Sequence, residues 1–206
     1  MFTEVDEKYV KARVVVQAAE ILRKGGVIIY PTDTVYAFAC DIRCKSAIEK
    51  IYSIKKIDRK KPLSFVFSDI SMMSSYVKNM PDYAFKVMRK VLPGPYTFIF
   101  NASKLLPDIV LTKQKTIGVR IPDSLYALEI VKELGVPFLS AGLDVEEGEF
   151  ETDPRNLPKH IINQVDIILD CGSKRAEIST MVDFSGDEAV VLREGKGSTD
   201  FIHGAY

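Results

Sequence analysis

The chain has 206 residues, of which 47% are hydrophobic and 27% charged, and its formal net charge at pH 7 is +0. These values are ordinary for a globular protein, and the length is compatible with one domain that buries a sizeable core. The balanced charge gives no argument for or against nucleic acid, so an anion site must come from a local cluster of cations. No apolar run approaches the roughly 18 residues of a membrane span. The sequence therefore predicts a cytoplasmic protein without membrane contact.

Cysteine and histidine are scarce. The three cysteines are Cys40, Cys44 and Cys171, and the two histidines are His160 and His203. The odd cysteine count favours free thiols in a reducing compartment. Cys40 and Cys44 lack the C-x-x-C spacing of common zinc sites, so we expect small buried hydrophobes rather than a structural metal. So few imidazoles and thiols also argue against a covalent nucleophile.

The first predicted elements are a helix and a strand. Apolar residues recur every three or four positions from about Val10 to Lys24, and Gly25-Gly26 follows. This pattern predicts an amphipathic helix with a glycine stop. The nearly continuous apolar run from Val27 to Tyr30 then predicts a strand covered on both faces. Pro31 lacks an N–H donor, so we expect the strand to end there.

The polar corner after Pro31 is the first candidate site. Thr32, Asp33 and Thr34 offer two hydroxyls and a carboxylate between this strand and a second one that reaches Asp41. Open α/β sheets bind ligands at such strand ends. The alternative is an ordinary Asx or Ser/Thr turn between two strands.

A basic run follows the next predicted helix, which covers about Lys45 to Lys55. The run from Lys55 to Lys61 has five cations in seven positions and precedes a strand-like segment, Pro62 to Phe67. A charge run is commonly a solvated loop. Cations between a helix and a strand can instead contact a polyphosphate, whose oxygens attract each of them.

The rest of the chain alternates helices with strands, which predicts a mixed sheet with helices on both faces. Helices are expected from Ser68-Asp69 to Tyr76, Pro81 to Val91, Pro122 to Leu134 with Gly135 as the stop, and Asp153 to Gln164. Strands are expected at Tyr96–Asn101, Thr116–Ile121, Pro137–Ser140, Val165–Leu169, Met181–Phe184 and Ala189–Arg193. Leu105 to Lys115 is expected to be a loop, and the acidic segment Ala141 to Asp153 a mobile surface loop.

The segment from Pro31 to Ala37, P-T-D-T-V-Y-A, resembles the P-T-[DE]-[ST]-x-Y-[GA] signature of the YrdC/YciO family. The characterised members of that family are threonylcarbamoyl-AMP synthases acting in tRNA modification. Ala37 and the segment Lys115 to Gly118 resemble the YciO branch. Together with further matches in the same order, the resemblance covers roughly residues 11 to 197. These are Lys55 with Lys61-Pro62-Leu63, Pro93-Gly94-Pro95-Tyr96-Thr97, Thr116 to Pro122, Val136 to Ser140, Ser179 to Asp183 and Val191 to Gly195.

The resemblance implies an α/β fold, α+β in strict terms. It is a single YrdC-like domain over residues 1–206, with a twisted open mixed β-sheet, helices on both faces and a concave basic cleft. It also implies the synthesis of L-threonylcarbamoyladenylate from L-threonine, bicarbonate and ATP with Mg²⁺, for the t6A modification of tRNA. Such a reaction requires positioning and charge neutralisation, and no side chain has to form a covalent bond.

Site residues are also implied by the resemblance. Thr32 and Ser179 would contact the amino acid, and Arg120 would form a bidentate pair with its carboxylate. The alternative for Arg120 is a surface ion pair. The residues that the resemblance places at nucleotide contacts are Lys55, Thr116, Thr152 and Arg193, and the basic run adds Arg59 and Lys61 as expected phosphate contacts.

The sequence departs from the synthases at three positions. The arginine of their K-x-R motif is Ile57 here, and their S-x-N motif aligns with Gly142 and Asp144. We expect Arg59, Lys60 or Lys61 to reach the same oxygens, and Asp144 to place an anion where polyphosphate would lie. The weakened nucleotide grip predicts reduced synthase activity.

Two further hypotheses accompany a weakened synthase. One is a non-catalytic module that binds tRNA, rRNA or double-stranded RNA, or the ribosome, through the basic concave face. The other is an enzyme of the same fold that acts on another small carboxylate and a phosphate substrate.

Overall fold

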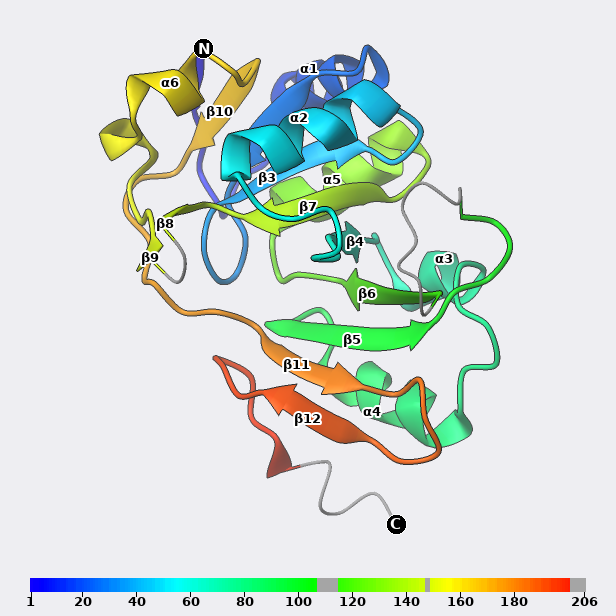
Figure 1. Ribbon diagram of the computed structural model, residues 1–206. Helices are drawn as coiled ribbons and strands as arrows, with labels where there is room; N and C mark the ends of the chain where they lie inside the picture. Colours follow the sequence, from blue (N-terminus) through cyan, green and yellow to red (C-terminus); the bar gives the residue numbers. More distant parts are fainter. Residues whose placement is uncertain (107–114, 147–148, 201–206) are drawn as a thin grey trace.

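The structure is a computed structural model that describes residues 1–106, 115–146 and 149–200. Ten strands of the described chain form one sheet in the order β1-β10-β2-β3-β7-β4-β6-β5-β11-β12, with β1 and β12 at opposite edges (Figure 1). Their bounds are β1 Phe2–Glu4, β2 Val27–Tyr30, β3 Ala37–Asp41, β4 Ser64–Val66, β5 Tyr96–Asn101, β6 Thr116–Arg120, β7 Phe138–Gly142, β10 Ile167–Asp170, β11 Thr180–Asp183 and β12 Val190–Arg193. A separate hairpin pairs β8 (Asp144–Glu146) with β9 (Glu149–Phe150).

The sheet is mixed, as predicted. Four neighbouring pairs are parallel: β1–β10, β10–β2, β4–β6 and β11–β5. The other five are antiparallel: β2–β3, β3–β7, β4–β7, β5–β6 and β11–β12. The expected architecture, a twisted open mixed sheet with helices on both faces, is confirmed. The helices are α1 Ala12–Arg23, α2 Lys45–Lys55, α3 Ile70–Ser74, α4 Asp82–Val91, α5 Leu125–Leu134 and α6 Lys159–Ile162.

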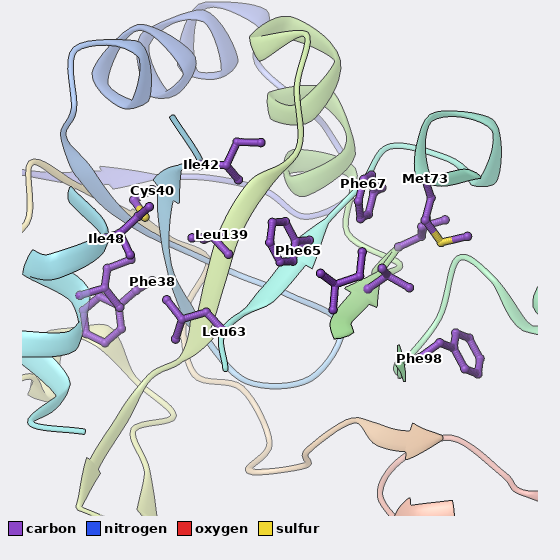
Figure 2. Packing of buried hydrophobic residues seen from close by; sticks show 14 of the residues in the cluster. Phe38, Cys40, Ile42, Ile48, Leu63, Phe65, Phe67, Met73, Phe98 and Leu139 are labelled. Atoms are coloured by element: carbon purple, nitrogen blue, oxygen red, sulfur yellow. The ribbon is translucent and has the colours of Figure 1, made fainter. Parts of the chain in front are cut away.

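Strand side chains divide between two apolar clusters because successive residues point to opposite faces. On β2, Val27 and Ile29 pack with α2 and α4 in one cluster, whereas Ile28 and Tyr30 pack with α1 and α5 in the other. Figure 2 shows the first cluster, in which Phe65 lies beside Leu139, its partner in the β4–β7 register. The continuous apolar runs of the sequence are therefore buried on both sides.

The second cluster leaves part of one sheet face free of helices. Its members come from β2, β3, β4, β7 and β10, and none comes from the described residues of β5, β6, β11 or β12. Three small residues, Gly118, Thr97 and Ser64, lie next to one another on that part of the face. A Cβ placed on Gly118 of β6 would lie 3.3 Å from Thr97 Cγ2 and 3.5 Å from Ser64 Oγ. This open part of the sheet forms the floor of the cleft described below.

Two helix predictions were correct because their end signals are local. Ser124 caps α5 by accepting a hydrogen bond from the backbone N–H of Ala127, and Gly135 ends the helix with a φ of 78°. Gly25 follows α1 with a φ of 81°. A left-handed backbone favours glycine, so both stops follow from residue type.

The expected mobile loop at Ala141 to Asp153 is wrong. Strand β7 continues to Gly142, and the β8–β9 hairpin follows it. Leu143 is fully buried and its N–H bonds to the carbonyl of Tyr36. Tertiary contacts therefore order a segment whose local sequence has no strand periodicity.

The expected helix from Asp153 to Gln164 is also wrong in extent. A 3₁₀ turn covers Pro154–Asn156, and α6 covers only Lys159–Ile162. Pro158 separates them, because residues before a proline disfavour the helical conformation. Strand β1 was not anticipated from the sequence. Most of the loop expected at Leu105 to Lys115 lies outside the described residues.

The described residues contain neither a membrane-spanning helix nor a cluster of metal ligands. No helix among them is long and apolar enough to cross a membrane. They also contain no group of three or more His, Cys, Asp or Glu side chains arranged to hold a metal ion. All three cysteines are free, and Cys40 is buried.

Replacing Phe65 with alanine tests the first cluster. Phe65 lies on a central strand and is 1% exposed. Truncation should lower the free energy of unfolding by about 3–5 kcal/mol, since the lost ring leaves a cavity. Phe85→Ala is the matched control, because Phe85 of α4 is 42% exposed. Urea unfolding with an unchanged m-value measures both, and equal losses would contradict this assignment of the core.

Candidate functional site

A cleft with a volume of about 520 Å³ lies over the open part of the sheet. Strands β4, β5, β6, β7, β11 and β12 contribute to its lining, together with the β2–β3 corner and the segment after α2. Of the described residues that line it, four are cationic and one is acidic. These are Lys55, Lys61, Arg120 and Arg193, with Asp144 as the acid. The cleft is therefore suited to a small anionic ligand.

The β2–β3 corner is closed by its own hydroxyls. Thr32 Oγ1 donates to the carbonyl of Val35 at 2.6 Å and accepts from the Thr34 N–H at 3.1 Å. The hydroxyls of Thr32 and Thr34 lie 2.9 Å apart. Thr32 is buried inside the turn, and Thr34 is the threonine that lines the cleft. The turn alternative therefore describes Thr32, whereas Thr34 of the same predicted corner faces the site.

Arg120 fastens this corner to the end of β6. Its Nη2 donates to Asp33 Oδ1 at 2.9 Å and to Thr34 Oγ1 at 3.1 Å. The side chains of Arg120 and Asp33 are only 12% and 7% exposed, so the pair is not a surface ion pair. Arg120 Nε is buried and has no hydrogen-bond partner among the described residues.

A second guanidinium lies on the far side of the floor. Arg193 donates from Nε and Nη2 to the Ser179 carbonyl at 3.1 and 3.0 Å, and from Nη2 to Ser179 Oγ at 3.1 Å. Ser179 Oγ is also 2.9 Å from Thr97 Oγ1. Burial lowers the pKa of Arg193, and the charge of Arg120 acts in the same direction. Two guanidiniums that repel each other stabilise an anion placed between them.

The basic run does not act as one unit. Lys55 is buried, forms an ion pair with Asp144 and donates to the Gly142 carbonyl at 2.6 Å. Burial, together with the charge of Lys61, lowers the pKa of Lys55 to about 8. The adjacent Asp144 carboxylate opposes this effect by stabilising the ammonium form. Lys61 lines the cleft, whereas Arg59 is 70% exposed and pairs with Glu49 of α2.

The structure thus places some predicted residues together and leaves others apart. Lys55, Lys61, Arg120, Ser179 and Arg193 line the cleft, as do the departure positions Ile57, Gly142 and Asp144. Arg59, Thr116 and Thr152 are not among its lining residues. Thr116 pairs with Asn101 at the opposite end of β6 from Arg120, and the Thr152 carbonyl accepts from the Lys174 N–H.

Several lining residues were not assigned a role from the sequence. Thr97 and Ser140 lie within segments that carry the family resemblance, and this was the available signal. Ser140 Oγ is 2.8 Å from the hydroxyl of the buried Tyr30. Phe150 comes from the hairpin that was expected to be a loop. No local pattern pointed to it.

Comparison with known proteins identifies the family of this chain. Residues 20–195 match the model of the Sua5/YciO/YrdC family, described as "Telomere recombination". The chain belongs to the Sua5/YciO/YrdC family. It is 39% identical to YciO of Escherichia coli over 90% of both chains. The crystal structure of that protein superposes with a TM-score of 0.92 at 36% identity, over 98% of both chains.

Synthases are also among the similar proteins. A putative threonylcarbamoyl-AMP synthase of Methanocaldococcus jannaschii is 33% identical over 85% of this chain and 82% of the archaeal one. The structure of Pyrococcus abyssi Sua5 complexed with L-threonine has a TM-score of 0.89 at 22% identity. It covers 100% of this chain, which spans 60% of Sua5. At that identity the likeness establishes the fold alone.

The buried phenol of Tyr30 gives a pH-dependent prediction. Burial raises the pKa of Tyr30 from 10.0 to about 12. Above pH 10 the unfolded chain loses this proton while the folded protein keeps it, so stability should fall by about 1 kcal/mol per pH unit up to about pH 12. Tyr30→Phe lacks this loss.

Urea midpoints at about pH 9 and about pH 11 measure the difference in slope. Tyr9→Phe is the control because Tyr9 is 71% exposed. Loss of the Tyr30–Ser140 hydrogen bond shifts the stability of Tyr30→Phe at both pH values without changing the slope. Equal slopes in wild type and Tyr30→Phe would contradict the prediction.

Proposed function

We propose that this protein is a nucleotidyltransferase that forms L-threonylcarbamoyladenylate from L-threonine, bicarbonate and ATP, for the t6A modification of tRNA. The observation that carries the proposal is the convergence of Arg120, Ser179 and Arg193 with Lys55 and Lys61 on one cleft. These residues are spread over most of the sequence, and strand ends bring them together. Family members named threonylcarbamoyl-AMP synthases support the same assignment.

The amino acid would bind beside the β2–β3 corner. Arg120 is a lining cation that bonds to this corner, and Asp33 and Thr34 fix the direction of its guanidinium. Ser179 offers a hydroxyl that Thr97 and Arg193 hold in place. A fixed guanidinium next to oriented hydroxyls suits a carboxylate and the side-chain hydroxyl of threonine. Thr32 supports this pocket through the turn.

The nucleotide would bind along the lysines and Arg193. In the transfer step a carbamate oxygen forms a bond to the α-phosphorus, and the bond from that phosphorus to the bridging oxygen of pyrophosphate breaks. Lys61 and Arg193 would stabilise the charge that collects on the leaving pyrophosphate. Mg²⁺ would arrive with ATP and be held by phosphate oxygens and water, because the cleft carboxylate Asp144 already pairs with Lys55.

The geometry favours this small-ligand function over an RNA-binding surface. Within the basic run, Lys55 is paired with Asp144 and Arg59 with Glu49, so at least two of its five cations have carboxylate partners. Phosphate contacts with RNA need several accessible cations. RNA binding is therefore the alternative function if the enzyme assignment fails.

The first test is pyrophosphate release from MgATP. We expect slow release that requires both L-threonine and bicarbonate, because Ile57 removes a charge-assisted contact, and each 1.4 kcal/mol lost is about tenfold in rate.

Ser179→Ala should weaken threonine binding by about tenfold, as it removes a hydroxyl contact. Calorimetry measures that binding. An absence of both pyrophosphate release and threonine binding would sink the enzyme assignment, and the RNA-binding module would replace it.

Replacing Ile57 with arginine should raise the rate of pyrophosphate release. Ile57 lines the cleft, so a guanidinium there adds a contact to phosphate oxygens and about a tenfold gain in turnover. Ser53→Arg is the control, because Ser53 is exposed on α2 and is not among the lining residues. The same gain from both variants would show a general charge effect and argue against a phosphate position at Ile57.

A further inference from the structure

The ion pair between Lys55 and Asp144 places two opposite charges on the lining of the cleft. Lys55 ends α2, whereas Asp144 begins the β8–β9 hairpin. Their side chains are 7% and 17% exposed, so water screens the pair little. Among the described residues, Asp144 is the one carboxylate on the lining.

The ammonium group of Lys55 bonds to other groups of the protein. It has three N–H donors. The ammonium group forms an ion pair with Asp144 and donates a hydrogen bond to the Gly142 carbonyl at 2.6 Å. Breaking a buried pair is costly, because it leaves one charge without compensation. A phosphate that recruited Lys55 would therefore have to compete with Asp144 for it.

The hairpin is held in the position that brings Asp144 to Lys55. Phe150 of β9 packs on Gly142, where a Cβ would lie 2.9 Å from Phe150 Cε1. The Glu151 N–H bonds to the carbonyl of the buried Leu143. Gly142 itself pairs with Ala37 of β3. Asp144 is thus a fixed part of the cleft wall.

The charge available to a ligand follows from these pairs. Asp144 neutralises Lys55, and Asp33 neutralises Arg120. Among the described residues, Lys55 and Arg120 therefore each have a carboxylate partner whose side chain is mostly buried. A chain of three phosphates concentrates more negative charge than one phosphate, so it depends more on cations without a competing carboxylate.

We propose that Asp144 is a specificity-determining residue of the nucleotide site. By neutralising Lys55 it shifts the preference of the cleft from nucleoside triphosphates toward ligands with a single phosphate, such as a nucleoside monophosphate or an acyl-adenylate. The inference depends on the proposed function, because it assumes that a nucleotide occupies this end of the cleft. In that reaction ATP is the triphosphate substrate, and the product is an adenylate with one phosphate.

Calorimetric titration of wild type and Asp144→Asn with ATP and with AMP tests the proposal. Asp144→Asn should bind ATP about tenfold more tightly, because Lys55 becomes available, while AMP affinity changes by less than about threefold. Glu149→Gln is the matched control. Glu149 lies on the same hairpin, is exposed and is not among the lining residues, so its neutralisation should leave both affinities unchanged.

A double-mutant cycle shows whether Asp144 acts through Lys55. Lys55→Gln should weaken ATP binding, and adding Asp144→Asn should restore an ATP-to-AMP affinity ratio within about threefold of wild type, since both partners are then neutral. The gain from Asp144→Asn alone should exceed the gain in the Lys55→Gln background. Equal gains in the two backgrounds would overturn the proposal, because Asp144 would then repel phosphate without involving Lys55. Far-UV circular dichroism and the melting temperature show whether each variant is folded. If Asp144→Asn alone does not fold, the ATP-to-AMP affinity ratio of the double variant tests the proposal.

Failure of this inference is distinguishable from failure of the proposed function. If ATP and AMP bind and the ratio does not respond to Asp144→Asn, the inference fails and the nucleotide site stands. If the ratio responds without any pyrophosphate release, the inference stands and the synthase activity fails. If neither wild type nor any variant binds nucleotide, both fail.

Discussion

The buried ion pair between Arg120 and Asp33 is the constraint on which the cleft depends. It joins the β2–β3 corner to the end of β6 across 87 positions of sequence. Asp33 Oδ2 also accepts from the Asp123 N–H, and Ser124 Oγ donates to the carbonyl of Pro31. The corner, the strand end and the start of α5 are therefore fastened together. Removing one partner of such a pair leaves a buried charge, which costs about 3–5 kcal/mol.

This arrangement also explains why Arg120 can serve a ligand without reorganising. Its guanidinium is oriented by Asp33 and Thr34 before a carboxylate arrives, so little side-chain entropy remains to be lost on binding. Arg193 is prepared in the same way by Ser179, which in turn bonds to Thr97 of the neighbouring strand. Arg120 is held by the β2–β3 corner and Arg193 by the sheet floor, so the fold determines the separation of the two cations.

Local sequence signals predicted much of this fold. Ser124 and Gly135 mark both ends of α5, and the Pro93-Gly94-Pro95 turn precedes a strand whose predicted bounds, Tyr96–Asn101, are those of β5. What depends on long-range pairing could not be predicted. The order of the strands in the sheet, the hydrogen bond of the buried Leu143 to Tyr36 and the ion pair of the hairpin with Lys55 all involve residues far apart in sequence.

The same distinction applies to the candidate site. Lys55, Arg120, Ser179 and Arg193 lie in family motifs and line the cleft, whereas Thr116 lies in a family motif but at the opposite end of β6. Within the basic run Lys61 lines the cleft, whereas Arg59 pairs with Glu49. A charge run shows where cations occur in the sequence, but partners decide where they point.

The three departures from the synthase motifs, Ile57, Gly142 and Asp144, line the cleft. Gly142 and Asp144 contact Lys55, whereas Thr34, Arg120 and Ser179 form hydrogen bonds with the β2–β3 corner, Thr97 and Arg193. Within the described part of the chain, no hydrogen bond or ion pair links these two groups directly. Substitutions at sites without shared partners are nearly additive in free energy. A change of charge beside Lys55 can therefore leave the hydrogen bonds of Thr34, Arg120 and Ser179 unchanged.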